Sequence, residues 1–146
     1  MTTQEEFEKV MAICREVFVK KMHDYGTAWR ILRTTSLTDQ IYIKANRIRS
    51  LQTKGHAMVN EGITPEFIGI INYAIMALIQ LELGVSDGTD ENDLRDKRAA
   101  ELYDKHAAEA LALMLRKNHD YDEAWRGMRV SSYADLILMK VFRTKQ

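Results

Sequence analysis

The feature that most constrains this chain is an internal duplication. Residues 20–47 align with residues 116–143 without a gap, at a spacing of 96, and thirteen of the 28 aligned pairs are identical. The residues of the first copy that recur in the second are Lys21, His23, Asp24, Tyr25, Ala28, Trp29, Arg30, Arg33, Ser36, Asp39, Ile41, Lys44 and Arg47. Self-similarity at a fixed period marks a structural unit that is used again, so we expect two homologous helix-loop-helix units.

Helical periodicity and the scarcity of helix breakers predict an all-α fold. The chain has one Pro and seven Gly in 146 residues, and its apolar residues recur with a period near 3.6. We expect helices over residues 3–22, around 27–32 and from 36 onward, where Ser36 and Asp39 have the S-x-x-D form of a capping box. Ser132 and Asp135 repeat that form, and the first helix of the second unit is expected over residues 91–118.

One segment is apolar on nearly all sides and is predicted to be a central helix. The sequence Thr64-Pro65-Glu66 has the residues of a helix start, so we expect this helix over residues 65–83, at the centre of the molecule or between chains. The expected organisation is a first unit over 1–84, a linker over 85–90 and a second, incomplete unit over 91–146. Together they predict one compact helical bundle, built from two homologous helix-loop-helix units around a central apolar helix.

The second unit contains no counterpart of residues 51–84. Three explanations stay open: the chain was truncated, one central helix serves both units, or a neighbouring chain supplies the missing packing. We expect a homo-oligomer, as the third explanation requires.

Composition excludes several classes of function. Lys plus Arg equals Asp plus Glu at 21 each, which argues against binding to duplex nucleic acid, because phosphate neutralisation dominates that affinity. A single cysteine, Cys14, excludes an internal disulfide framework and is expected in the core. The longest apolar run, residues 67–79, is shorter than the roughly 20 residues that span a bilayer. With no secretory signal pattern at the N-terminus, we expect a soluble, cytoplasmic protein.

The duplicated cations predict a site for an anionic ligand. Arg30 and Arg33 lie one helical turn apart, and Lys44 occupies a position where the seam of its helix calls for an apolar residue. With aromatic residues beside them, these cations suit a nucleotide or another phosphate ligand. The alternative is an intramolecular network in which Asp24 or Asp39 pairs with a cation. The candidate ligand-binding residues are Lys21, His23, Asp24, Tyr25, Trp29, Arg30, Arg33, Asp39, Lys44, Arg47, Asn72, Tyr73, Lys117, His119, Asp120, Tyr121, Trp125, Arg126, Arg129, Asp135, Lys140 and Arg143.

Metal chemistry has weaker support in the sequence. One imidazole and one carboxylate per unit, as in His23 and Asp24, are too few for a protein-only zinc site, so no metal site is expected there. An alternative function is a magnesium-dependent nucleotide pyrophosphohydrolase that would use the helical carboxylates of Glu5, Glu8, Glu61 and Glu66. Magnesium is the cofactor only in that case. A third alternative is a structural oligomerisation module, and whether any reaction is catalysed stays open.

Three stretches resemble one protein family. They are K-x-H-D-Y-G-x-A-W at residues 21–29, S-x-x-D-x-I-x-x-K-x-x-R-I at 36–48 and I-I-N-Y-A-I-M-A-L-I at 70–79. The chain resembles the bacterial and phage family called nucleotide modification-associated domain 1. That resemblance implies an all-helical fold and a link to nucleotide or modified-base metabolism. By position, the family-like polar residues are Lys21, Asp24, Tyr25, Lys44, Arg47, Asn72 and Tyr73.

A looser likeness connects the chain to the all-helical nucleoside triphosphate pyrophosphohydrolases. Those enzymes hold magnesium with clustered carboxylates on two helices. Here Gly69 and Asn72 stand where such an enzyme needs carboxylates, which argues against metal-dependent hydrolysis.

Overall fold

The computed structural model describes residues 1–54, 59–88 and 96–145, and within these ranges it is all-α. Its long helices are α1 (Thr3–Tyr25), α2 (Thr34–Lys54), α3 (Val59–Leu83), α4 (Asp96–Tyr121) and α5 (Val130–Lys145). Two short 3-10 helices, η1 (Ala28–Ile31) and η2 (Ala124–Gly127), follow α1 and α4. The predicted all-α class is confirmed. Residues 89–95, which include part of the expected linker and the expected start of the second unit, lie outside the described residues.

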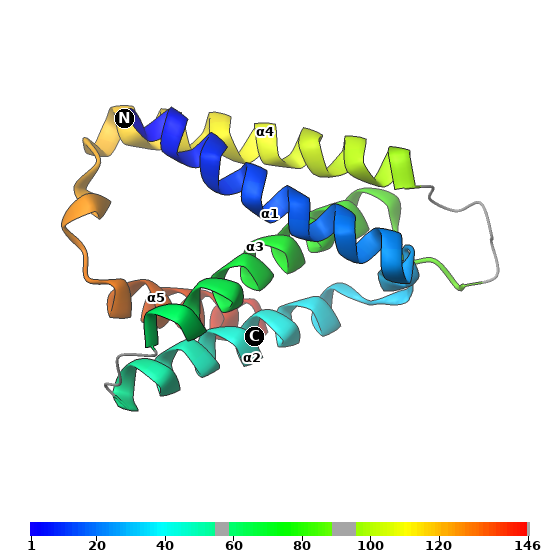
Figure 1. The fold of residues 1–146 in the computed structure, drawn as a ribbon, viewed down its shortest axis with the longest axis horizontal. Helices are drawn as coiled ribbons and strands as arrows, with labels where there is room; N and C mark the ends of the chain where they lie inside the picture. Colours follow the sequence, from blue (N-terminus) through cyan, green and yellow to red (C-terminus); the bar gives the residue numbers. More distant parts are fainter. Residues whose placement is uncertain (55–58, 89–95, 146) are drawn as a thin grey trace.

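The two copies of the repeat pack helix against equivalent helix. α1 contacts its counterpart α4, and α2 contacts its counterpart α5. Figure 1 shows each pair running antiparallel, with α1 and α4 forming one layer and α2 and α5 the other. α3 crosses diagonally between the layers and contacts α1, α2 and α4.

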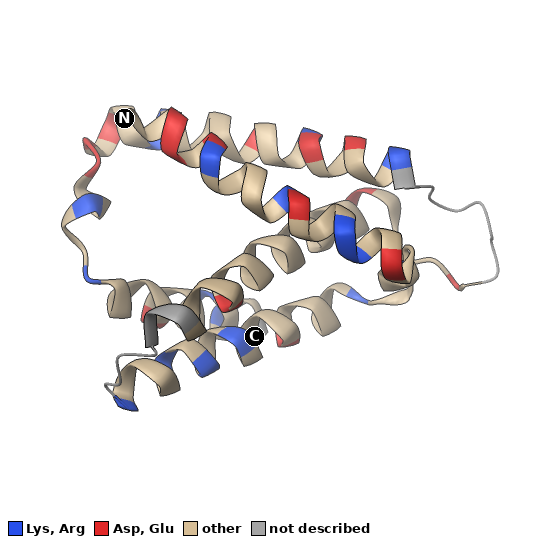
Figure 2. Ribbon diagram, viewed as in Figure 1, with Lys and Arg blue, Asp and Glu red and all other residues tan. Residues whose placement is uncertain are grey.

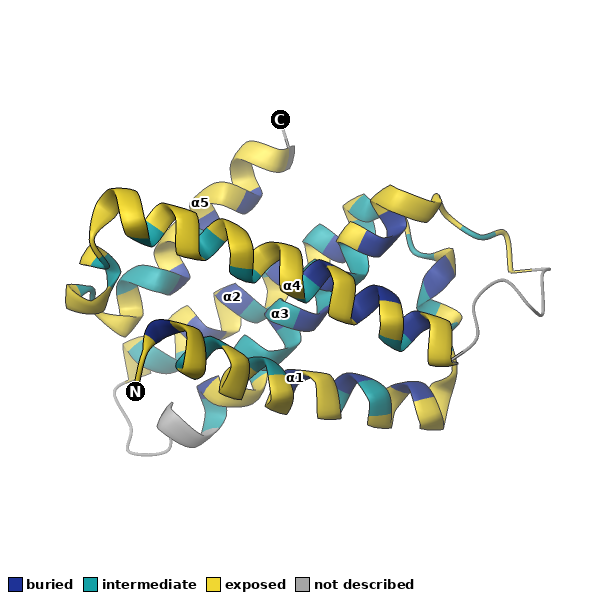
Figure 3. Ribbon diagram, turned by 90° about the horizontal axis from the view of Figure 1, so that it is seen from above, coloured by how far each residue is buried: buried dark blue, intermediate teal, exposed yellow. Residues whose placement is uncertain are grey.

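The central helix contributes to two separate cores. Its C-terminal half places Ile75 and Ile79 against Phe18 of α1 and Leu102 of α4. Its N-terminal half takes part in a second cluster with residues of α2 and α5, among them Leu138. One central helix therefore packs against both units, as one of the three explanations for the asymmetry requires. The outer faces of α1 and α4 are exposed (Figure 3).

α3 is also the most apolar helix of the chain. It carries no Lys or Arg, and the ribbon segments coloured as charged residues in Figure 2 lie mainly on the other helices. Residues 62–83 are long and apolar enough to cross a membrane by length and composition alone, and 22% of the most apolar window is buried in the fold. The core helix of a soluble protein meets the same criterion. The predicted absence of a membrane-spanning segment stays a prediction.

Helix α1 ends later than the sequence indicated. It continues through His23 to Tyr25 and stops at Gly26, whose φ of 65° lies in the left-handed region that favours glycine. In the second unit, Asp122 stands in the position of Gly26 and adopts a φ of 55°. The next residue differs between the two turns, because Thr27 has a φ of −106° whereas its counterpart Glu123 has a φ of 55°.

The expected starts of two helices are wrong. The backbone N–H of Leu37 already donates to the carbonyl of Arg33, so α2 begins before Ser36 and Ser36 is not its cap. α3 begins at Val59, and Pro65 lies inside it. Ile63, one helical turn after Val59, is buried against the α2–α5 cluster. This packing stabilises the first turn of α3, although Pro65 favours a helix start later in the sequence.

Candidate functional site

A pocket of about 360 Å³ lies between α1, α2 and α3 and contains two lysines. Lys21 comes from α1, Lys44 from α2, and Asn72 and Tyr73 from α3. We call this the lysine compartment. Apolar residues of α1 and α3, such as Phe18, complete its walls. The pocket thus brings together four of the seven polar residues that the family resemblance singled out.

A second cavity, of about 230 Å³, adjoins the first and is more aromatic. It shares Phe18, Lys21, Tyr73 and Met76 with the lysine compartment and adds Tyr25, Gly26, Ala28, Trp29 and Leu32. We call it the tryptophan compartment. The indole N–H of Trp29 is buried and has no hydrogen-bond partner among the described residues. The two compartments adjoin and form one site, with Lys44 of α2 at one end, Trp29 of η1 at the other, and Lys21 lining both.

Lys44 is held in the site by its neighbours. Its amine lies 3.4 Å from a carboxylate oxygen of Glu66 and 5.9 Å from the ring centroid of Tyr73. Arg47 binds the other oxygen of Glu66 at 3.1 Å. The stem of Lys44 crosses α3 at Gly69, where an added Cβ would lie 2.5 Å from the lysine Cδ and Cε. Gly69 therefore provides the space that lets Lys44 reach the pocket.

Asn72 has a packing role at the wall of the pocket. Its side-chain N–H donates to the carbonyl of Cys14 at 3.1 Å, and its oxygen accepts from the hydroxyl of Tyr103 at 2.7 Å. This one side chain links α3 to both α1 and α4. Burial raises the pKa of Tyr103, which keeps its hydroxyl protonated and able to donate. Cys14 is fully buried, as predicted.

Arg30 is buried inside the fold. It donates to the side chain of Gln80 and, at 2.7 Å, to the carbonyl of Gly84, at the end of α3. Gln80 in turn donates to the carbonyls of Arg30 and Leu32 at 2.8 and 2.7 Å. These bonds fix η1 on the C-terminal end of α3, where a cation is also favoured by the helix dipole. Arg30 is thus bound within the fold, through the Gln80 side chain and the Gly84 carbonyl.

The remaining candidates of the first unit lie on the surface. His23, Asp24, Arg33 and Asp39 are exposed, and none of them lines either compartment. Trp29 is half-buried and packs against the α1–α3–α4 core, with its ring 6.1 Å from that of Phe18.

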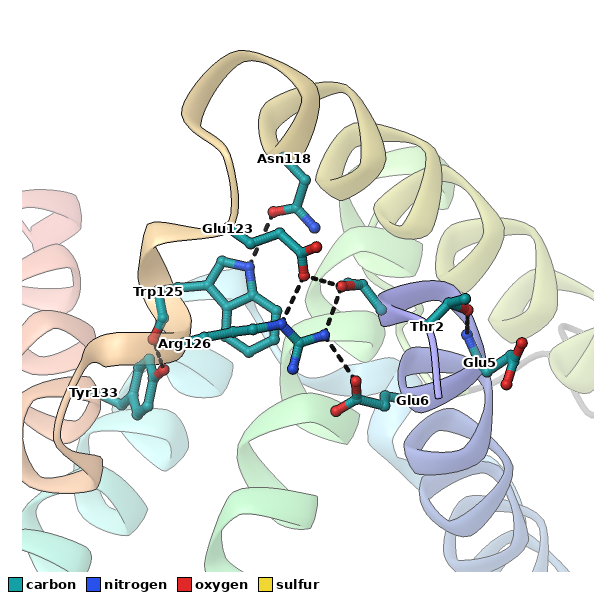
Figure 4. Close-up of polar contacts among 9 residues, drawn as sticks. Thr2, Glu5, Glu6, Asn118, Glu123, Trp125, Arg126 and Tyr133 are labelled. Atoms are coloured by element: carbon teal, nitrogen blue, oxygen red, sulfur yellow. Dashed lines mark hydrogen bonds and ion pairs between the residues drawn. The ribbon is translucent and has the colours of Figure 1, made fainter.

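The equivalent residues of the second unit are arranged differently. Arg126, the counterpart of Arg30, binds Glu6 and Glu123 at 2.7 Å each and lies over the ring of Trp125 at 4.6 Å (Figure 4). Trp125 donates to Asn118 at 3.0 Å. The other candidates of this unit are exposed side chains on α4, α5 and the segment between them: Lys117, His119, Asp120, Tyr121, Arg129, Asp135, Lys140 and Arg143.

The described carboxylates do not gather into a metal site. Within the described residues, no group of three or more His, Cys, Asp and Glu is placed to hold an ion. Glu8 lies thirteen residues before Lys21 on α1, which is about 20 Å along the helix axis. Glu66 binds Lys44 and Arg47 instead. The side chain of Glu61 lies outside the described part of the chain.

Sequence reasoning gave three residues that build this site no role in it, although Glu66 and Gly69 were considered in connection with magnesium. Gly69 makes room for Lys44, Glu66 fixes its amine, and Gln80 anchors η1. The available signal was a polar or small residue inside an otherwise apolar helix. That signal is weak, because it does not show which neighbouring helix such a residue faces.

Comparison with known proteins assigns a family. The family described as "Nucleotide modification associated domain 1" matches residues 21–81 and 117–146, which is more than half of the chain. Comparison with curated proteins and with solved structures gave no match. The two matched segments begin at equivalent positions of the internal repeat, Lys21 and Lys117, and the first extends beyond the repeat to residue 81. The chain belongs to the nucleotide modification associated domain 1 family.

Proposed function

We propose that the pocket between α1, α2 and α3 binds a nucleotide or a closely related phosphate ligand. The observation that carries this proposal is the convergence of Lys21 and Lys44, from two different helices, on one compartment. Lysine binds phosphate as a point charge, so two lysines that line one compartment suit an anionic ligand. Family membership supports a role connected with nucleotides.

The local charge balance favours an anionic ligand. Among the described residues, the cationic side chains of Lys21, Lys44 and Arg47 lie in or beside the lysine compartment, where Lys44 and Arg47 face the carboxylate of Glu66. The Glu66 side chain is 15% exposed and already faces two of these cations. A phosphate that enters the compartment meets Lys21 directly and shares Lys44 with Glu66.

The tryptophan compartment suits the base. Tyr25, Trp29 and Tyr73 line it, and stacking on aromatic rings is tolerant of base identity. The buried indole N–H of Trp29 has no acceptor among the described residues, so an acceptor on the ligand would relieve the cost of leaving it unpaired. This orientation places the phosphate toward α2 and the base toward η1.

A calorimetric titration tests the proposal. The probes are purine and pyrimidine deoxynucleoside mono-, di- and triphosphates, each with and without magnesium. The test variant is K21M/K44M, and the matched control is K117M/K140M, which changes the equivalent lysines of the second unit. Losing two charged contacts to phosphate should weaken binding by at least about a hundredfold in the test variant.

Equal affinity of the two double variants for every nucleotide would refute the assignment of the pocket. A thermal-shift screen complements the titration, since a ligand at a hundred times its dissociation constant stabilises a protein by about 2.7 kcal/mol. A stabilisation that requires magnesium would point to the carboxylates instead and would revive the pyrophosphohydrolase alternative.

A further inference from the structure

A separate groove of about 460 Å³ lies on the other side of α3 and is almost entirely apolar. One wall is the N-terminal part of α1, a second is α4 with Trp125 of η2, and the floor is α3. Its apolar lining residues are Phe7, Val10, Met11, Ile71, Ala74, Ile75, Leu78, Ala107, Ala110, Met114 and Trp125.

Through the internal repeat, the wall of the groove formed by α4 and η2 corresponds to the surface of α1 and η1 that α3 covers in the first unit. Its residues Ala107, Ala110, Met114 and Trp125 stand 96 positions after Met11, Cys14, Phe18 and Trp29. Of these four first-unit residues, Met11, Phe18 and Trp29 pack in or against the cluster that contains Ile75 and Ile79 of α3. Phe18 packs in one cluster with Ile75 and Ile79 of α3, and Asn72 of α3 binds the carbonyl of Cys14.

The α1 wall repeats the same relation. Thr3, Glu6 and Phe7 are the counterparts of Ala99, Leu102 and Tyr103 on α4. These three α4 residues belong to the core cluster that contains Ile75 and Ile79 of α3. Both walls of the groove are therefore equivalent to surfaces that clasp the C-terminal half of α3. The second unit has the clasp, and the helix that follows it, α5, is the counterpart of α2 and packs against α2.

The duplicated arginine gives independent support. Arg30 of the first unit holds the end of α3 through Gln80 and the carbonyl of Gly84. Its counterpart Arg126 lies beside the groove and binds Thr3 and Glu6, which both line it (Figure 4). The arginine that binds the end of α3 in the first unit thus has its counterpart at the edge of the groove in the second unit.

We infer that this groove is a docking site for a partner helix with the chemistry of α3. The occupant is an apolar α-helix with branched aliphatic residues one turn apart, as Ile75 and Ile79 are, and with a glutamine near its C-terminal end for Arg126. Burial of its apolar face against the two walls drives the association. The repeat specifies the occupant because the equivalent residues of the first unit already bind such a helix.

A labelled peptide tests this inference on the whole chain. It has the sequence of residues 64–84, with lysines added at both ends for solubility, and its binding is measured by fluorescence anisotropy. The control peptide carries I75K and I79K. The test variant of the protein is Ala110→Arg, in the wall of the groove, and the matched control is Ala112→Arg, on the same helix but outside the lining. Both alanines are exposed, so neither change disturbs the core.

The inference predicts that the peptide binds the unchanged chain and the Ala112→Arg variant with similar affinity. Ala110→Arg should weaken binding at least about tenfold, because it places an unpaired charge against an apolar helix, and the control peptide should fail for the same reason. Absence of peptide binding, or equal binding to both variants, would overturn the inference. Sedimentation of the chain alone tests for a second copy of the chain as the occupant. If the chain forms a dimer that Ala110→Arg dissociates and Ala112→Arg leaves intact, a second copy fills the groove. That result would overturn the proposal of a separate partner helix.

Discussion

The hydrogen bond between Tyr103 and Asn72 offers a sharp test of how the fold supports the site. Tyr103→Phe removes only the hydroxyl that donates to Asn72 at 2.7 Å. The ring keeps its place, stacked on Phe18 with centroids 4.7 Å apart. Asn72 still donates to the carbonyl of Cys14 but loses the donor to its oxygen. Because Tyr103 is 1% exposed and Asn72 6% exposed, water cannot readily replace the lost hydroxyl.

The expected cost follows from this burial. A buried acceptor that loses its partner destabilises a protein by about 1–3 kcal/mol. For a chain of this size, each kcal/mol lowers the unfolding temperature by roughly 2–4 °C. The variant Asn72→Leu should cost a similar amount, because it leaves the hydroxyl of Tyr103 buried and unpaired. The double variant removes both polar partners of the bond, so its cost should be clearly smaller than the sum of the two single costs.

Urea unfolding of the four proteins, followed by circular dichroism, measures the three free-energy differences. Strict additivity, with each single variant costing less than about 0.5 kcal/mol, would refute the argument, since surface changes commonly have effects of that size. Alkaline titration gives a second readout. Because burial raises the pKa of Tyr103 in the folded chain, its contribution to stability is present below the ordinary tyrosine pKa and declines as pH rises above about 10. Tyr103→Phe should reduce that alkaline loss.

Two further predictions concern the lysine compartment and the contact between the N-terminus and the second unit. Gly69→Ala should change the free energy of unfolding by less than about 1 kcal/mol, because the gain in helix propensity offsets the displacement of Lys44. The same substitution should weaken nucleotide binding in the titration described above. Unchanged affinity would show that the position of Lys44 does not matter for binding. Hydrogen bonds from Arg126 lower the pKa of Glu6, and those from Thr3 and Arg126 lower that of Glu123, so their contribution to stability is present above the ordinary glutamate pKa of 4.5 and lost as pH falls through the lowered values. Arg126→Gln should therefore lower the unfolding temperature most at pH 7 and progressively less below pH 4.5, and an equal effect at every pH would contradict this linkage.

Much of the helical framework follows from local pattern alone. The apolar stripe of α1, the end of α3 at Leu83 and the burial of Cys14 depend on residues close together in sequence, so periodicity predicts them well. The starts of α2 and α3 were predicted wrongly because tertiary packing overrides local signals at helix ends. Ile63 shows the reason, since its burial against α2 and α5 extends α3 past the boundary that Pro65 marks.

The candidate site was predictable as a set of residues but not as an arrangement. The duplicated motif drew attention to Lys21 and Lys44, and the family resemblance added Tyr73. Their convergence depends on how α1, α2 and α3 cross, which no spacing along the chain encodes. The same limit applies to the motif arginines, since Arg30 is buried while Arg126, in an almost identical local sequence, remains exposed.

The sequence by itself determined that this protein is helical, that it contains one unit twice, and which side chains the two copies share. These properties are local, because helix formation and repeat identity depend on neighbouring residues. Only the tertiary structure decided that α3 packs against both units, that it builds a lysine pocket in the first, and that the equivalent clasp of the second is an open groove. The C-terminal half of α3 can pack against only one of the two homologous surfaces. Because it packs against the first, the equivalent surface of the second unit remains uncovered.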